Sequence, residues 1–494
     1  MNILFVYPEF PDTFWSFKHA LKFVHKKSSS PPLGLLTIAA MLPATFNKRL
    51  VDMNVTDLKQ EDIDWADIVF ISAMTVQRSS TLEVIQRVKA SKKPIAAGGP
   101  LFTMEKDNFA EVDYLILNEG EITLPLFLAD LALDRPKHIY ETSEYADIRL
   151  TPSPEWRLLN LKKYDSMCLQ YSRGCPFNCD FCNVTSLLGH KMRLKTTKQF
   201  IAELDGLYAL GWRRNIFIVD DNFIGNKEAL KRELLPALIK WRHGKKGCLF
   251  ITEASVNLSD DDELMDLMVR AGFTQVFVGI ETPDDTSLKE CHKSQNRNRD
   301  LVSNVRKMQN IGLQVMGGFI VGFDNDDDRI FQRQIDFIQK SGIVTAMVGL
   351  LQAPIGTSLY QRMLREGRLG PDPYSGDNVD GDTNILPLMN PDKLKNGYRQ
   401  ILDTIYSPKE FTDRVITFLK NYHPKRHAVT MEFQEVAALF RSMYLIGVKS
   451  KEPKYYWKLF FWSLFHEPTK FPLAITFSIY GYHFQKVNQL HVAA

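Results

Sequence analysis

The stretch LQYSRGCPFNCDFC at residues 169–182 contains the feature on which the fold assignment rests. Its cysteines, Cys175, Cys179 and Cys182, have the spacing C-x3-C-x2-C, between a strand-like run and a helical stretch. The chain has 494 residues and 6 cysteines, three of them in this loop, which does not suit a disulfide framework. The loop therefore predicts a metal site in a reducing cytoplasm.

The cysteine spacing favours a [4Fe-4S] cluster with one open iron. A cubane normally takes four thiolates, so three cysteines leave the fourth iron free. An open iron can chelate the amino and carboxylate groups of S-adenosylmethionine, much as a catalytic zinc keeps one position for its substrate. Structural zinc with His190 as fourth ligand is the alternative, although such sites usually pair two short cysteine or histidine elements. The isolated cysteines are expected to be small buried hydrophobes: Cys168, Cys248 and Cys291.

Residues 1–135 have the pattern of a doubly wound, Rossmann-like parallel α/β domain. The strand-like runs are 69–71, 94–97 and 114–117, and a helical pattern covers 81–90. Polar and glycine residues follow these runs at 72–77, 98–100 and 118–121. Because ligands bind at the carboxyl ends of the strands in open α/β sheets, these three loops are predicted to line one site.

A linker at 136–165 separates this domain from a second α/β series at 166–372. Strand-like runs recur at 169–172, 215–219, 248–251, 275–278, 315–321 and 346–351. Regular β-then-α repetition predicts a partial TIM-type barrel, with its active site at the carboxyl ends of the strands. Residues 373–494 predict a mainly helical third domain dense in aromatic residues. We expect most of these aromatics to be core, although interleaved lysines also suit an interfacial helix.

Composition is that of a globular protein, with 45 % hydrophobic and 24 % charged residues. The net charge of +3 is too small to indicate nucleic acid as a partner. The N-terminal run MNILFVY at residues 1–7 is typical of a first buried strand, not of a signal peptide. The apolar stretch 455–465 is too short to span a bilayer. A cytoplasmic location is expected.

Taken together, these features resemble the cobalamin-binding radical SAM family, which carries a B12-binding domain, a radical SAM barrel and a C-terminal domain of unknown function. The resemblance implies that polar side chains at the ends of barrel strands bind S-adenosylmethionine. These are Asp220, Asp221, Asn222, Glu253, Ser255 and Glu281. The segment GGFIVGFD at 317–324 resembles the G-x-I-x-G segment of the superfamily, which implies adenine contacts by Gly318, Ile320 and Gly322.

The N-terminal domain resembles the B12-binding part of these enzymes, which implies cobalamin as a further cofactor. The residues implied to contact it are Ser72, Thr75, Gly98, Gly99, Pro100 and Glu119. Without side chains at Gly98 and Gly99, the backbone can approach a large flat ring. The sequence lacks D-x-H-x-x-G, so a histidine ligand to cobalt is not expected. A nucleotide-binding or purely structural domain is the alternative, because fold alone does not fix a ligand.

Within the cobalamin-binding subgroup, strings such as 219–227, 252–258, 293–296 and 406–408 resemble the family that contains the hopanoid C-2 methylases. This similarity implies methyl transfer to an unactivated carbon through a 5′-deoxyadenosyl radical and methylcobalamin. The loop after the cluster departs from those methylases. Asn183 stands where Asp is usual, and Leu188, His190 and Met192 replace a Tyr-Gly-Arg-x-Pro pattern.

Three functions therefore stay open at this stage. The first is C-methylation of a small molecule or of a lipid such as a hopanoid. The second keeps the radical chemistry without methyl transfer, as in cyclisation, rearrangement or carbon–carbon coupling. The third is a non-catalytic iron–sulfur protein, which would not need the carboxylates at the strand ends. An enzyme of this kind also needs an external electron donor such as flavodoxin or ferredoxin, and a lipid substrate would suit peripheral membrane contact.

Overall fold

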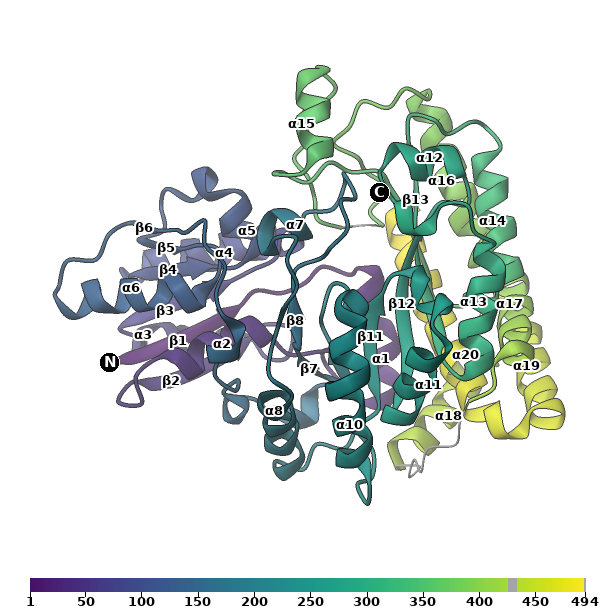
Figure 1. The fold of residues 1–494 in the computed structure, drawn as a ribbon, viewed down its shortest axis with the longest axis horizontal. Coiled ribbons are helices and arrows are strands. Elements are labelled where there is room, and N and C mark those ends of the chain that lie inside the picture. The colour runs from purple at the N-terminus through teal and green to yellow at the C-terminus, as the bar shows by residue number, and fades with distance from the viewer. Residues whose placement is uncertain (378, 425–432, 493–494) are drawn as a thin grey trace.

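The computed structural model describes residues 1–377, 379–424 and 433–492, and Figure 1 shows two α/β bodies side by side with helices packed on the outer side of the second. The first body contains a fully parallel sheet in the order β2-β1-β3-β4-β5-β6. Its strands are β1 (Asn2–Tyr7), β2 (Asn47–Asp52), β3 (Ile68–Ser72), β4 (Ile95–Gly98), β5 (Tyr114–Ile116) and β6 (Ile139–Tyr140). The doubly wound fold is confirmed.

Successive side chains along each strand point to opposite faces of this sheet, and helices cover both faces. In β1, Leu4 and Val6 pack toward α3 (Gln60–Trp65), α4 (Arg78–Ala90) and α5 (Pro100–Met104). Ile3 and Phe5 pack on the opposite face, toward α2 (Leu33–Met41) and α6 (Gly120–Ala132). Because both faces are buried, the strands are continuously apolar. The edge strand β6 lies within the predicted linker 136–165 and pairs with β5.

The second body contains six parallel strands in the order β14-β13-β12-β11-β10-β7, which confirms the partial barrel. The strands are β7 (Met167–Leu169), β10 (Ile216–Ile218), β11 (Phe250–Ala254), β12 (Phe273–Glu281), β13 (Gln314–Val321) and β14 (Ala346–Leu350). The main helices between them are α8 (Thr197–Ala209), α10 (Leu235–Arg242), α11 (Asp262–Ala271), α13 (Leu301–Ile311) and α14 (Ile330–Ser341). Polar caps start several of these helices; Asp261, for example, accepts a hydrogen bond from the backbone of Leu264.

The cysteine loop leaves the barrel on a two-stranded antiparallel ribbon. Strand β8 (Ser172–Arg173) pairs with β9 (Arg193–Leu194), and the loop between them contains α7 (Val184–Leu188). In Figure 1, α7 lies between the first sheet and the barrel. The loop is thus presented at the junction of the two α/β bodies.

The third region is mainly helical, as expected. It contains α16 (Pro391–Ile405), α17 (Pro408–Asn421), α18 (Phe433–Leu445), α19 (Pro453–His466) and α20 (Phe471–Val492), whereas α15 (Ser358–Arg365) precedes it, within the range predicted for the barrel. No helix in the described ranges is both long and apolar enough to cross a membrane. Its aromatics are divided: Tyr456 and Phe484 are buried, whereas Phe461 and Phe465 are exposed.

One packing arrangement was not predicted from sequence. The segment 14–24 leaves the first domain and packs against the C-terminal helices, with the rings of Phe14 and Phe484 stacked 4.3 Å apart. Trp15 reaches the barrel, where its ring meets Phe277 edge-on at 5.5 Å and its Nε1 donates to Sδ of Met347. The segment 14–24 therefore joins the barrel to α20.

Candidate active site at the cysteine loop

The cysteine loop is shaped by a glycine at its start. Gly174 has φ of +96°, and a Cβ there would lie 2.7 Å from the carbonyl oxygen of Lys191 and 3.0 Å from that of Gly189. Glycine is needed because the two ends of the loop approach each other this closely. The backbone N–H of Cys175 donates to the same Gly189 carbonyl at 3.2 Å, which closes the loop.

Cys175, Cys179 and Cys182 are free thiols that are partly accessible. Burial raises the pKa of all three, that of Cys182 to about 12. Protonated thiols must lose their protons on binding iron, so cluster assembly and proton release are coupled. Among the described residues, no group of three His, Cys, Asp or Glu side chains is placed to hold a single metal ion. A [4Fe-4S] cubane does not need its ligands to converge on one ion, because each thiolate binds its own iron.

Two residues of the segment after α12 (Asp285–Glu290) face the cysteines. Lys293 is buried, and its Nζ lies 2.7 Å from Oε1 of Glu281. Nε2 of Gln295 donates to Sγ of Cys179 at 3.8 Å. A cation and an amide donor beside the loop suit an anionic iron–thiolate cluster, whose potential depends on hydrogen bonds to sulfur. In the sequence, both residues belong to the string 293–296, which was noted only for its family resemblance. Their position beside the cysteines was therefore not predicted.

The predicted carboxylate Glu281 is therefore paired with a protein cation. It sits at the end of β12 with φ of +64°, next to a bulge in the pairing with β13. A positive φ is unusual for a residue with a side chain. The neighbouring Gly279 leaves room for this ion pair, because a Cβ on it would crowd Oε1 of Glu281 and Nζ of Lys293.

Three other predicted carboxylates gather at the ends of β10 and β11. Asp220 accepts hydrogen bonds from the backbone of Tyr171 at 2.7 Å and from Oγ of Ser172 at 2.5 Å. In the part of the chain that the structure describes, the Glu253 side chain has no hydrogen bond or ion pair. Burial, reinforced by mutual repulsion, raises the pKa of Asp220 to about 7 and of Glu253 to about 8. Burial also raises the pKa of Asp221 to about 6.

Such a cluster of acidic groups fits a cationic ligand with hydroxyl donors. A nearby positive charge favours the ionised form of each carboxyl, and donors would satisfy its free oxygens. S-adenosylmethionine has both a sulfonium cation and ribose hydroxyls. Asn222 is nearby, since its Oδ1 accepts from the backbone and Oγ of Ser255 at 3.3 and 3.4 Å.

The predicted adenine-contact residues lie along β13 and just after it. A Cβ on Gly318 would lie 2.8 Å from the ring of Phe277, and Ile320 is half-buried. Gly322 has φ of +104°, and its N–H donates to Oδ2 of Asp326 at 2.9 Å. The structure thus brings Gly318 against a barrel aromatic, and places Gly322 in a turn.

At the carboxyl edge of the first sheet, Ser72 and Gly98 are register partners. Gly99 has φ of +91°, and a Cβ on it would lie 2.6 Å from Oγ of Ser72. A Cβ on Gly98 would lie 2.5 Å from the carbonyl of Ile116. Pro100 then begins α5. Both glycines are therefore needed because the protein's own backbone and Ser72 approach them closely.

Thr75 of this edge faces the barrel and the third region. It lines a narrow crevice with no room for a water molecule, together with Met104, Glu105, Asn183, Pro354, Ile355 and Tyr374. Pockets for drug-sized ligands are roughly 300–1,000 Å³. Because a corrinoid is larger still, its binding here would have to displace part of this lining. The segment at Tyr374 covers Thr75, since a Cβ on Gly376 would lie 2.9 Å from the Thr75 Cβ.

Glu119, predicted to contact cobalamin, is instead paired with arginines. Arg193 forms two hydrogen bonds with its carboxylate, at 2.6 and 2.7 Å, and Arg173 lies 3.7 Å away. A third hydrogen bond comes from the backbone of Ala146 at 2.6 Å. Neither arginine was singled out in the sequence, because nothing local shows that they face the first domain.

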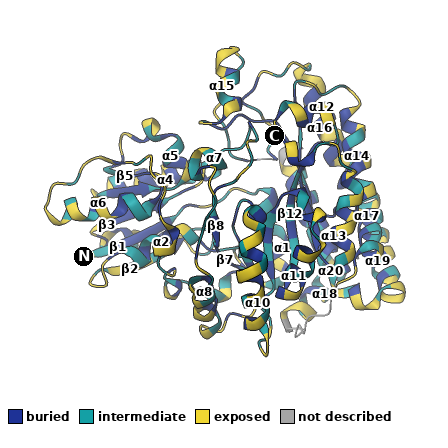
Figure 2. Cartoon of the chain, in the orientation of Figure 1, coloured by how far each residue is buried: buried dark blue, intermediate teal, exposed yellow. Residues whose placement is uncertain are grey.

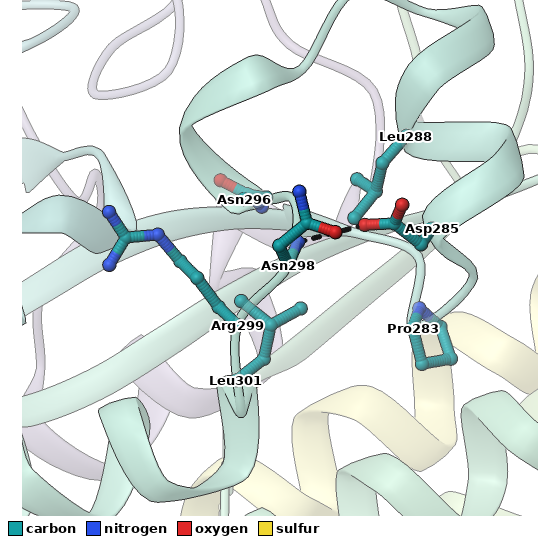
Figure 3. A pocket seen from close by; sticks show the side chains of 7 residues that line it. All are labelled: Pro283, Asp285, Leu288, Asn296, Asn298, Arg299 and Leu301. Carbon is teal, nitrogen blue, oxygen red and sulfur yellow. Dashed lines mark hydrogen bonds between the residues drawn. The ribbon is translucent and has the colours of Figure 1, made fainter.

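A separate hollow of about 340 Å³ lies beside the segment that follows β12, as Figure 3 shows. Its charged side chains already have protein partners. Arg299 pairs with Asp260 at 2.6 Å, and Oδ1 of Asp285 accepts from the backbone of Asn298 at 2.9 Å. This polar lining does not indicate a ligand.

Three protein-family models match the chain in succession, and the third begins at 357, within the range predicted for the barrel. Residues 24–128 match the B12 binding domain, 169–338 match the radical SAM superfamily, and 357–494 match a domain of unknown function (DUF4070).

Two curated relatives align over most of their length. An uncharacterized methyltransferase of Synechocystis sp. is 41 % identical over 99 % of this chain and 92 % of its own. The hopanoid C-2 methylase of Rhodopseudomonas palustris is 34 % identical over 92 % of this chain and 88 % of its own.

Solved structures share the fold at low identity. The cobalamin-dependent S-adenosylmethionine radical enzyme OxsB, with aqua-cobalamin and S-adenosylmethionine bound, has a TM-score of 0.63 at 14 % identity, covering 100 % of this chain and 80 % of its own. The radical S-adenosylmethionine methyltransferase TsrM from Kitasatospora setae, with cobalamin and a [4Fe-4S] cluster bound, has a TM-score of 0.60 at 14 % identity, covering 80 % of this chain and 85 % of its own.

Proposed function

Because the chain belongs to the family of radical SAM enzymes with an N-terminal B12-binding domain, we propose that it transfers a methyl group to an unactivated carbon of its substrate. One observation carries this proposal most directly. The end of the cysteine loop, at Asn183, lines a crevice with Thr75 of the first sheet's carboxyl edge, and the carboxylate of Asp221 beyond β10 lies near Cys175 and Cys182. When bound, the cluster and S-adenosylmethionine supply a carbon-centred radical, and cobalamin supplies the methyl carrier.

The residues of the chain divide this work between two surfaces. Cys175, Cys179 and Cys182 hold the cluster. Asp221, Asn222, Glu253 and Ser255 accept hydrogen bonds from S-adenosylmethionine, with Gly318, Ile320 and Gly322 against its adenine. Asp220, which is fully buried and hydrogen-bonded to Tyr171 and Ser172, orients this edge of the barrel instead. On the other side, Ser72, Thr75, Gly98, Gly99 and Pro100 form the cobalamin face. The donors of the reducing electrons are proteins such as flavodoxin or ferredoxin.

We test the proposal by anaerobic reconstitution with iron, sulfide and cobalamin, followed by EPR and product analysis. A hopanoid lipid is the first substrate to test, because the methylase from R. palustris is 34 % identical. Methyl transfer yields S-adenosylhomocysteine and 5′-deoxyadenosine together. Formation of 5′-deoxyadenosine with an altered but unmethylated product would favour cyclisation or coupling instead. Protein that cleaves no S-adenosylmethionine under any condition would contradict both.

A lipid substrate is supported by an exposed apolar surface on the third region. Four residues spaced by four along α18 and just beyond it are exposed: Val436, Phe440, Tyr444 and Val448. On α19, Trp457 stacks on Phe461 and Phe461 stacks on Phe465, which is 75 % exposed. Figure 2 shows α18 and α19 at the outer edge of the molecule, away from the first domain.

Charge on the same helices favours an anionic membrane as the partner of this surface. Residues 433–466, which span α18 and α19, contain five Lys or Arg and two Glu. Lys449 and Lys454 lie over the rings of Tyr444 and Tyr455 at 4.7 and 4.9 Å. Apolar residues beside lysines are typical of surfaces that enter the headgroup region of anionic lipids.

Vesicle sedimentation tests this contact. We expect the holoprotein to bind vesicles containing phosphatidylglycerol and to bind phosphatidylcholine vesicles weakly. Phe465→Ser together with Phe461→Ser should abolish binding, whereas Leu150→Ser, which removes an equally exposed residue of the linker, should not. Equal binding by all forms, or none by any, would contradict the membrane proposal and leave the methyl-transfer proposal standing.

A further inference from the structure

We infer that Glu119 and Glu121 of the first domain clamp the base of the cysteine loop, and so fix the cluster relative to the B12-binding domain. The inference deepens the proposed function and rests on it. The partners are Arg173 and Arg193, which are directly opposite each other in the β8–β9 ribbon. The whole cysteine loop lies between these two arginines.

The clamp consists of two nearly buried ion pairs. Arg193 contacts both oxygens of Glu119, at 2.6 and 2.7 Å. Arg173 contacts both oxygens of Glu121, at 2.7 and 3.1 Å. The side chain of Glu119 is 4 % exposed and that of Arg193 is 14 % exposed. Both carboxylates stand at the start of α6, so one helix end of the first domain holds both strands of the ribbon.

The β8–β9 ribbon needs the two glutamates to balance the charges of its arginines. It has only two residue pairs, Ser172 with Leu194 and Arg173 with Arg193. Two-stranded ribbons are marginal alone, and like charges directly opposite destabilise an antiparallel pair. A buried guanidinium without a partner costs several kcal/mol. The carboxylates of the first domain therefore stabilise a strand pairing that belongs to the second.

Arg193 also contacts the cysteine loop directly. Its guanidinium also donates to the carbonyl of Leu188 at 3.0 Å, at the end of α7, and to that of Ala146 at 2.9 Å. The guanidinium lies 5.0 Å from the ring centre of Tyr145, and a Cβ on Gly189 would lie 2.8 Å from that ring. One side chain thus connects the first domain, the linker and the cysteine loop.

This geometry gives Glu119 a positioning role in place of the predicted contact with cobalamin. Both of its oxygens are engaged by Arg193, and one also accepts from Ala146. Direct contact with a corrinoid would have to break these bonds. A positioning role predicts faster loss of the cluster when the carboxylate is removed, whereas a direct cobalamin contact predicts loss of corrinoid.

The experiment uses the full chain, reconstituted with cluster and cobalamin. Glu119→Gln, Arg193→Gln and the double variant are compared with Glu141→Gln, which removes the carboxylate of an exposed ion pair with Lys106. We expect the two single variants to lose cluster about tenfold faster than wild type, as for other residues that orient metal ligands. The double variant should be no worse than either single one. Corrinoid absorbance should be kept, and Glu141→Gln should match wild type.

The EPR spectrum of the reduced cluster separates positioning from general stability. Its line shape should change in both single variants, because the loop is displaced while the cysteines remain. Loss of corrinoid with an unchanged cluster would overturn the inference in favour of a cobalamin contact. Additive losses in the double variant would also overturn it.

Arg193→Lys keeps the proposal testable if the glutamine variants fail to fold. It retains the charge but loses the two-point contact, so cluster loss should be intermediate. A wild-type rate of loss would overturn the inference. Failure of the proposed function is a separate result, because wild-type protein itself would then bind no corrinoid or cleave no S-adenosylmethionine.

Discussion

Nζ of Lys293 lies 2.7 Å from Oε1 of Glu281, and their side chains are 11 % and 8 % exposed. Burial lowers the pKa of Lys293, but Glu281 and the thiols of Cys179 and Cys182 raise it, and the net direction is upward. Lys293 therefore stays protonated beside the cysteine loop, where Glu281 balances its charge.

Lys293→Met should destabilise the protein by about 3–5 kcal/mol, because it leaves the Glu281 carboxylate buried without its cation. Chemical denaturation of the cluster-free chain measures this loss. Lys89→Met is the matched control, since Lys89 pairs with Asp113 at 2.9 Å but is 37 % exposed. Surface pairs contribute only about 0–1 kcal/mol. Equal losses in the two variants would show that the Lys293 pair has no special role.

Gln295→Leu should lower the reduction potential of the cluster. The amide donates to Cys179, and donors to sulfur stabilise the more negative, reduced state. EPR-monitored redox titration of the reconstituted protein gives the potential. Gln332→Leu, which removes a surface amide bonded to Asp336, serves as control. An unchanged or higher potential in Gln295→Leu would show that this hydrogen bond does not act on the cluster.

Much of the fold could be predicted because the decisive signals are local. The run 315–321 predicted β13, observed as Gln314–Val321, and the cysteine spacing placed the loop without tertiary information. Glycine pairs likewise marked the edge of the first sheet. These patterns depend on neighbours in the sequence.

Contacts between distant segments could not be predicted in this way. Arg193 and Glu119 are 74 residues apart, and Trp15 and Met347 are 332 apart. Sequence periodicity shows which side chains are buried but not which partners they meet. For that reason Glu119 was assigned by its place after a strand, and its engagement with arginine appears only in the structure.

The pH dependence of the free energy of unfolding should reveal the ionisation of Glu253. Burial, reinforced by Asp221 and Asp220, raises its pKa from 4.5 to about 8 in the folded chain. A raised carboxyl pKa contributes stability that is present below pH 4.5 and is lost as pH rises through about 8. Glu253→Gln should therefore be more stable than wild type at pH 9 and equal to it at pH 4. Denaturant titrations across this range measure the difference, and parallel curves would contradict the prediction.

Gly99→Ala should weaken cobalamin binding while sparing the cluster. Gly99 has φ of +91°, and its new Cβ would lie 2.6 Å from Oγ of Ser72 and 3.2 Å from the carbonyl of Ala73. Backbone strain of this kind costs of order 1–3 kcal/mol, and the added methyl would push aside Ser72, whose hydroxyl we propose contacts the ring. Corrinoid absorbance after gel filtration reports binding, and iron content reports the cluster. Gly34→Ala is the control, because a Cβ there meets nothing within 4 Å and its helical backbone accepts alanine. If Gly99→Ala retained as much corrinoid as Gly34→Ala, the glycine edge of the first sheet would not be the cobalamin face.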